Sequence, residues 1–155
     1  RRSRGLGDVY KRQDLSNSAM ASWVAENNSL MKRLNDEKQE IVLNVLSEEI
    51  CTHSDIELDL IGITGNLRKI VLTGSTNIVF AETFFSNHVI EKFSKFGKLG
   101  DEPLGKFLFS DPNITKHETY VATYSLDNQD YQGRKCIYDF DGSKFSVIEV
   151  FLFND

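Results

Sequence analysis

The chain has 155 residues, 40% of them hydrophobic, and a formal net charge of −5. This length fits one globular domain, and neither its two prolines nor any Gly/Ser-rich run marks a linker. The apolar runs are strand-sized and interrupted by charges, well short of the roughly 20 residues that cross a bilayer. We therefore expect a cytoplasmic monomer without membrane insertion or a secretory signal.

The first thirteen residues, RRSRGLGDVYKRQ, are predicted to be foreign to the domain. They show no apolar periodicity, and DVYKRQ is what a transposon-end sequencing adapter encodes when it is read as codons. We therefore assign residues 1–13 to a non-native segment and residues 14–155 to one domain, truncated at its natural N-terminus. Five basic residues against Asp8 give the segment a charge of +4, so residues 14–155 carry −5 less +4, or −9. Without a basic cluster, this acidic domain is not expected to bind nucleic acid.

In the first third of the chain, the hydrophobic pattern changes from helical to extended. Apolar residues from Leu15 to Leu34 recur at near-helical spacing, which predicts a helix over residues 15–36. Residues 41–46 then alternate as in a strand, and residues 51–59 have the composition of a loop.

The middle of the chain predicts a hairpin followed by a helix. Residues 66–73 and 78–85 are β-rich runs that flank the turn Gly74-Ser75-Thr76-Asn77. Residues 86–96 place their apolar side chains on one face of a helix, with Ser86 or Asn87 available as the N-cap and a glycine after the last turn.

The last third predicts a short helix or turn at residues 104–109, a strand at 117–126, and a closing hairpin. Residues 135–140 and 143–153 flank Asp141-Gly142, a favoured two-residue hairpin turn. Helix, strands, helix and strands joined by short hairpin links predict an α+β fold, with an antiparallel sheet covered by helices on one side.

Two charged residues lie where strands are otherwise apolar. Glu149 shares a face of the last strand with Val147 and Phe151, and an unpaired buried carboxylate costs several kcal/mol. An exposed edge strand or a structural ion pair with a buried arginine would each explain it without a function. Arg68, on a face with Ile70, offers a planar fork that binds carboxylates. Together, Arg68 and Glu149 suggest a buried site for one anionic group and one hydroxyl.

Other motifs in the chain do not predict a nucleotide, metal or disulfide site. Gly100–Phe107 nearly matches a phosphate-binding loop, but Phe107 stands where a hydroxyl would bind magnesium. No metal site is predicted, because the histidines are dispersed at His53, His88 and His117. The two cysteines, Cys51 and Cys136, are expected to be free thiols.

Four segments, in order, resemble the chorismate lyase family between Leu15 and Asp155. SWVAENNSLMKRL resembles the family's first helix, and NLRKIVL with IVFAETFF resembles the paired strands around its arginine. FGKLGDEPLGKFLFSDPNITKHE resembles its Pro-Leu-Gly segment, and IEVFLFND resembles its C-terminal strand.

The resemblance implies helical flaps over an enclosed pocket and a cofactor-free conversion of chorismate to 4-hydroxybenzoate and pyruvate. Ubiquinone biosynthesis, plastoquinone biosynthesis and another 4-hydroxybenzoate product are the open alternatives for the pathway served. It carries four ligand positions over to this sequence: Arg68, Leu104, Glu149 and Leu30. We expect Arg68 and Glu149 to be catalytic, with Arg68 clamping the ring carboxylate and Glu149 holding the ring hydroxyl. The backbone of Leu104 and Gly105 is expected to add hydrogen bonds, and Leu30 an apolar wall.

Two positions depart from the family pattern. Leu30 stands where the family commonly has methionine, and leucine keeps the wall apolar. Glu82 stands where the family often has an arginine before the residue that matches Thr83, so it reverses a charge expected near an anionic ligand. An alternative is a small-molecule effector-binding domain of a transcription regulator. Such domains resemble the same fold, and they bind a small molecule without converting it. A relative with altered substrate or without catalysis is a third interpretation.

Overall fold

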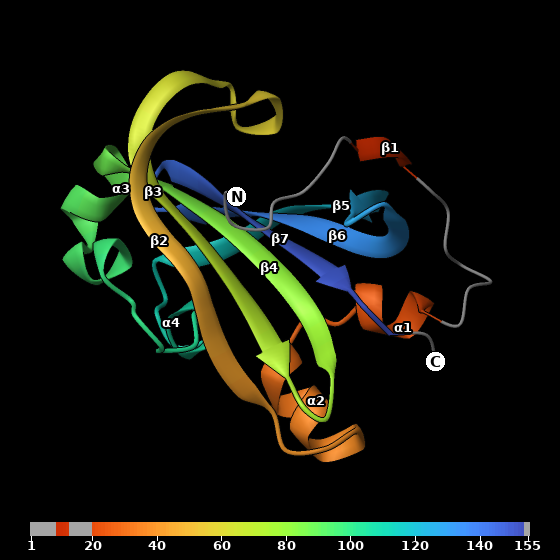
Figure 1. Ribbon diagram of the computed structural model, residues 1–155. Coiled ribbons are helices and arrows are strands. Elements are labelled where there is room, and N and C mark those ends of the chain that lie inside the picture. Colours follow the sequence, from red (N-terminus) through yellow and green to blue (C-terminus); the bar gives the residue numbers. More distant parts are fainter. Residues whose placement is uncertain (1–8, 13–19, 154–155) are drawn as a thin grey trace.

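A computed structural model describes residues 9–12 and 20–153. Within them, one seven-stranded sheet has the order β1-β5-β6-β7-β4-β3-β2, and all its pairings are antiparallel (Figure 1). The strands are β1 (Val9–Arg12), β2 (Val42–Asp55), β3 (Leu60–Thr73), β4 (Asn77–Ser86), β5 (Ile114–Leu126), β6 (Gln129–Phe140) and β7 (Ser143–Phe151). The helices are α1 (Ala21–Val24), α2 (Leu30–Glu37), α3 (Asn87–Lys92) and α4 (Gly105–Leu108), with 3-10 turns η1 (Ile56–Leu58) and η2 (Ser94–Gly97). The predicted α+β class with an antiparallel sheet is confirmed.

Strand β1 lies at one edge of the sheet, where its backbone pairs with β5. Residues 1–8 and 13–19 lie outside the described residues. The assignment of residues 1–13 to a non-native segment, with one domain over residues 14–155, therefore stays a prediction.

The single helix predicted over residues 15–36 is wrong in its middle. Two helices replace it: the first ends at Val24, and Ser29 caps the second. The Ser29 backbone is extended (φ −60°, ψ 114°), and its hydroxyl accepts a hydrogen bond from the Lys32 amide at 3.2 Å. Polar side chains such as Asn28 and Ser29 favour caps over helix interiors, which explains the break. The predicted residues 15–19 lie outside the described part.

The loop predicted at residues 51–59 is also wrong. Strand β2 continues to Asp55, and β3 begins at Leu60, so the two strands form a long hairpin arm closed by η1. Within the arm, Cys51 pairs with Gly65. The polar composition of this segment predicts a loop. The strand opposite it contains β-branched residues such as Ile63 and Thr64, and its backbone pairs with the backbone of the segment.

The turns and the second helix follow the predictions more closely. Asp141 and Gly142 both have positive φ, 50° and 90°, as a type I′ hairpin turn requires. Helix α3 is capped by Ser86, whose hydroxyl accepts from the Val89 amide at 3.2 Å. The predicted helix over residues 86–96 is split at Phe93, whose backbone is extended (φ −148°, ψ 95°), and resumes as η2.

The helices pack on one face of the sheet in two clusters. Around α1 and α2 the buried residues include Trp23, Leu34, Leu72, Val79 and Phe151. Around α3, η2 and α4 they include Phe85, Val89, Phe96, Leu104, Phe145 and Val147. Residues of both clusters line a cavity between them.

The hairpin arm packs over the opposite face of the sheet through buried charges. Lys135 donates from Nζ to the Asp55 carboxylate at 2.6 Å and to Glu57 at 2.9 Å, and Ser146 donates to Asp55 at 3.1 Å. Asp55 is 5% exposed and Lys135 9% exposed, so this ion pair is screened little by solvent.

We expect Lys135→Met to lower the free energy of unfolding by about 3–5 kcal/mol, because it leaves a buried carboxylate without its cation. Urea unfolding followed by the fluorescence of Trp23, the single and fully buried tryptophan, measures the change. Lys32→Ala is the control, since its pair with Asp36 is largely exposed, and its midpoint should stay within error of the parent's. Equal midpoints for the two variants would contradict the prediction.

Candidate active site

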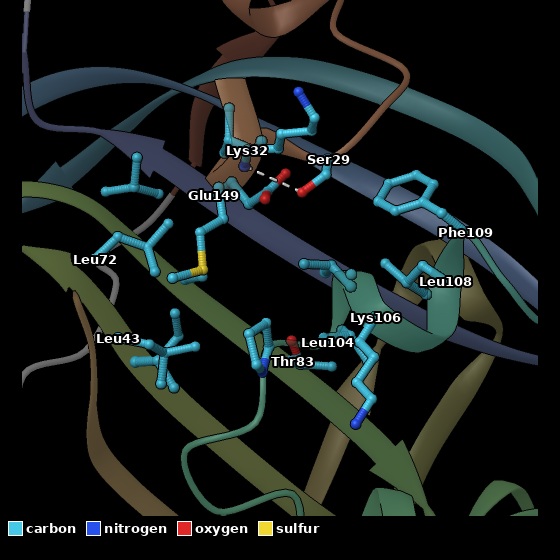
Figure 2. A pocket seen from close by; sticks show the side chains of 18 of the residues that line it. Ser29, Lys32, Leu43, Leu72, Thr83, Leu104, Lys106, Leu108, Phe109 and Glu149 are labelled. Atoms are coloured by element: carbon cyan, nitrogen blue, oxygen red, sulfur yellow. Dashed lines mark hydrogen bonds between the residues drawn. The ribbon is translucent and has the colours of Figure 1, made fainter. Parts of the chain in front are cut away.

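A cavity of about 530 Å³ lies between the helix-covered face of the sheet and helices α2 and α4. Figure 2 shows its labelled side chains arranged around this space, with Ser29 and Lys32 from the start of α2 and Leu104, Lys106 and Leu108 from α4 and its cap. The sheet side combines apolar side chains with five polar ones: Arg68, Thr83, Arg134, Tyr138 and Glu149. Apolar walls with a small number of polar groups are typical of small-molecule sites.

Arg68 extends from β3 into the cavity and is 2% exposed. Its Nη2 donates to the carbonyls of Gly100 at 3.0 Å and Glu102 at 2.9 Å, which fixes the loop before α4 to the sheet. Its Nε lies 4.0 Å from the Glu48 carboxylate and has no hydrogen-bond acceptor among the described residues. Burial lowers the pKa of Arg68, and Glu48 opposes this by raising it.

Glu48 secures the same loop from β2. Its carboxylate accepts from the backbone amides of Leu99 and Gly100, both at 3.2 Å, and from the Asn66 side chain at 3.3 Å. The segment Gly100–Phe107, which nearly matches a phosphate-binding loop, thus carries α4 toward Arg68. Its backbone carbonyls accept from an arginine, which is the opposite of the amide-lined cradle that phosphate needs.

Glu149 also lines the cavity, but its ionic partner is Arg134. Arg134 Nε lies 2.8 Å from Glu149 Oε1, and their side chains are 4% and 17% exposed. Arg68, whose planar fork suits a carboxylate, has Glu48 as its ionic neighbour instead. The sequence left open a structural ion pair between Glu149 and a buried arginine, and this pair is present. Arg68 lines the same cavity as the pair.

Arg134 was not among the residues predicted for the site, although the spacing of the last hairpin carries a signal for it. A two-residue turn at Asp141-Gly142 sets the register of the last hairpin and places Arg134 directly opposite Glu149. Directly opposed residues share a face of the sheet, so Arg134 had to face the cavity with Glu149. Burial lowers the pKa of Arg134, and the Glu149 charge more than offsets this, so the net shift is upward.

The three remaining predicted ligand positions also line the cavity. Leu30 is the first residue of α2 and is 5% exposed, so it contributes an apolar wall. Leu104 and Gly105 lie at the start of α4, where the first backbone N–H groups have no acceptor within the helix. The structure thus brings together Arg68, Leu104, Gly105, Glu149 and Leu30, while their roles stay predictions. The opening of α2 and α4 as flaps also stays a prediction.

Glu82 does not lie near the site, which corrects the expectation drawn from its reversed charge. It pairs with Ile148 in the sheet, and its neighbour Thr83 faces the cavity. Since side chains alternate along a strand, Glu82 faces the hairpin arm on the opposite side. Burial raises the pKa of Glu82, and Lys69 and Lys135 partly offset this.

The remaining candidate residues form no second site. In the described part of the chain, no group of histidine, cysteine and acidic residues is arranged to hold a metal ion. Cys51 and Cys136 are free thiols whose pKa values are raised, mainly by burial. The His53 ring packs on Phe84 at 4.7 Å between centroids. No helix within the described residues has the length and apolar character that a membrane crossing needs.

The cavity lies between an antiparallel sheet and a layer of short helices, and buried arginines and a carboxylate line it. These features define an α+β protein with a small-molecule site. A family model described as chorismate lyase matches residues 9–155, and the chain belongs to the chorismate lyase family. Family membership makes it an enzyme of the lyase class.

Curated relatives agree with this family. A protein of Pseudoalteromonas translucida (strain TAC 125), named probable chorismate pyruvate-lyase, is 29% identical over 156 residues, which cover 90% of this chain and 86% of the relative. Proteins of the same name from Shewanella frigidimarina (strain NCIMB 400) and Pseudomonas putida are 26% and 31% identical. The two aligned regions cover 92% and 76% of this chain, and 85% and 71% of the respective relatives.

Proposed function

We propose that this protein is a chorismate pyruvate-lyase, which converts chorismate to 4-hydroxybenzoate and pyruvate without a cofactor. One observation carries the proposal: Arg68 and Glu149 line the same cavity, one with an unused donor and the other with a carboxylate. A ring with a carboxylate at one end and a hydroxyl at the other has the polarity to span them. The names of the relatives point to the same reaction.

Arg68 binds the ring carboxylate in this proposal. Two carbonyls hold its guanidinium in place, so little conformational entropy is lost when an anion binds. Backbone amides at Leu104 and Gly105 add donors from the start of α4. Apolar neighbours such as Leu30 and Leu72 exclude water and so strengthen these charged hydrogen bonds.

The reaction breaks two bonds and makes the ring aromatic. The C–H bond at the hydroxyl-bearing ring carbon breaks, and its electron pair forms the new ring double bond. The ether C–O bond breaks, and its pair leaves with enolpyruvate, which takes up a proton and becomes pyruvate. Glu149 accepts a hydrogen bond from the ring hydroxyl and assists the movement of the ring proton. Arg134 holds this carboxylate in place through a charged hydrogen bond.

Incubation of the full chain with chorismate tests the proposal. We expect 4-hydroxybenzoate and pyruvate in equal amounts, because each turnover releases one of each. Their appearance is followed by chromatography and by a coupled pyruvate assay, with heat-unfolded protein as the blank. A folded chain that binds 4-hydroxybenzoate but forms neither product would contradict the proposal and favour the effector-binding alternative.

A further inference from the structure

We infer that Arg134 is a positioning residue that holds the Glu149 carboxylate and the chain leading into α2 as one unit. The inference rests on the proposed function, since it assigns a partner to the proposed catalytic carboxylate. Arg134 Nε donates to Glu149 at 2.8 Å, and Nη1 donates to the backbone carbonyls of Val24 at 2.9 Å and Glu26. Val24 is the last residue of α1 and Glu26 lies in the linker to α2, and both are more than a hundred residues away in sequence.

The planar guanidinium suits this double task. It offers donors in fixed directions, so one group can bind a carboxylate and two carbonyls together. Arg134 is 3% exposed, and an unpaired charge at such depth is costly, so all three contacts stabilise each other. A lysine would keep the charge beside Glu149 but lacks the fork that reaches both carbonyls.

The linker held by Arg134 carries part of the site. It leads directly to Asn28, Ser29 and Leu30, which line the cavity at the start of α2. Any displacement of Glu149 is therefore transmitted through Arg134 to the residues that close the cavity. Arg68 has the matching position on the other side, where it holds the loop before α4. Each buried arginine thus joins the sheet to one of the two helices that cover the cavity.

Arg33 provides a matched control on the same helical segment. It donates to the Ser22 carbonyl at 2.8 Å, lies 3.6 Å from the Glu26 carboxylate, and covers the Trp23 ring at 3.7 Å. It is therefore as much a part of the α1–α2 packing as Arg134. Arg33 does not contribute to the cavity lining, so its loss loosens the segment without removing the partner of Glu149.

The test compares Arg134→Met, Arg134→Lys and Arg33→Met with the parent in the full chain. The values of kcat/KM and of 4-hydroxybenzoate affinity report on the placement of Glu149, and hydrogen–deuterium exchange at residues 24–30 reports on the linker. In Arg134→Met, kcat/KM should fall at least about tenfold and 4-hydroxybenzoate should bind more weakly, because the carboxylate has lost the charged donor that orients it. Arg134→Lys should recover most of both, since it keeps a cation beside Glu149, and Arg33→Met should leave both unchanged. Exchange at residues 24–30 should accelerate at least about tenfold in Arg134→Met.

Unchanged kcat/KM, affinity and exchange in folded Arg134→Met would overturn the inference. Identical changes in Arg33→Met would also overturn it, because loose packing alone would then explain them. If Arg134→Met does not fold, an Arg134→Lys variant that folds but recovers neither kcat/KM nor affinity serves as the contradicting result. A parent without turnover would contradict the proposed function alone, since affinity and exchange still test the role of Arg134.

Discussion

Arg68→Ala is expected to lower kcat/KM for chorismate by at least about 100-fold, or ~2.8 kcal/mol at ~1.4 kcal/mol per factor of ten. The variant loses the cation for the ring carboxylate and releases the Gly100 and Glu102 carbonyls that hold the loop before α4. Arg68→Lys should recover only a small part, because an ammonium cannot reproduce the planar contact. Steady-state kinetics with chorismate and titration with 4-hydroxybenzoate measure both effects.

Lys69→Ala is the matched control for this prediction. Lys69 is the next residue on the same strand, it carries the same charge, and it pairs with Glu82 in the sheet rather than lining the cavity. Its variant should keep the parent's kcat/KM. Similar losses in Arg68→Ala and Lys69→Ala would show that general electrostatics attract the substrate, and would remove Arg68 from the proposed site.

Local chemistry made much of this fold predictable. The Asp141-Gly142 turn, the Ser86 cap and the hairpin around Gly74-Ser75-Thr76-Asn77 depend on residues that are close in sequence. The hairpin arm was not predictable in the same way. Polar residues after Cys51 become a strand because Leu60–Gly65 folds back on them, and because Lys135 holds Asp55 from another part of the chain.

The site was predictable to the extent that strand alternation determines faces. Alternation places Arg68 with Ile70 and puts Glu149 with Val147, and all four line the cavity. The same rule could have moved Glu82 to the opposite face, since it adjoins a cavity-lining threonine in β4. The hairpin register could likewise have found the arginine opposite Glu149.

Long-range contacts of the site lie beyond such rules. The bond from Arg134 to the Val24 carbonyl spans 110 residues, and the bond from Arg68 to Gly100 spans 32. Each depends on where a short helix packs over the sheet, and tertiary burial determines that position far more than helix propensity does. Sequence patterns therefore identified the charges of the site but not the network that orients them.

Glu149→Gln is expected to lower kcat by about 10²- to 10⁴-fold, the range that a positioned general acid or base contributes. Glutamine has nearly the same shape, and its amide oxygen can still accept from Arg134, so the fold and the cavity should persist. The 4-hydroxybenzoate affinity should change far less than kcat, because the ring hydroxyl still finds a hydrogen-bond partner. Single-turnover kinetics and a binding titration separate the two quantities.

Glu82→Gln is the control, because it makes the same chemical change on the opposite face of the sheet and should leave kcat intact. This pair of variants also separates an enzyme from a binding domain. A carboxylate that moves a proton is needed mainly in the transition state, so its loss lowers kcat, whereas a carboxylate that only recognises the hydroxyl contributes to affinity. A Glu149→Gln variant with weakened 4-hydroxybenzoate binding and an unchanged kcat would therefore limit Glu149 to ligand recognition.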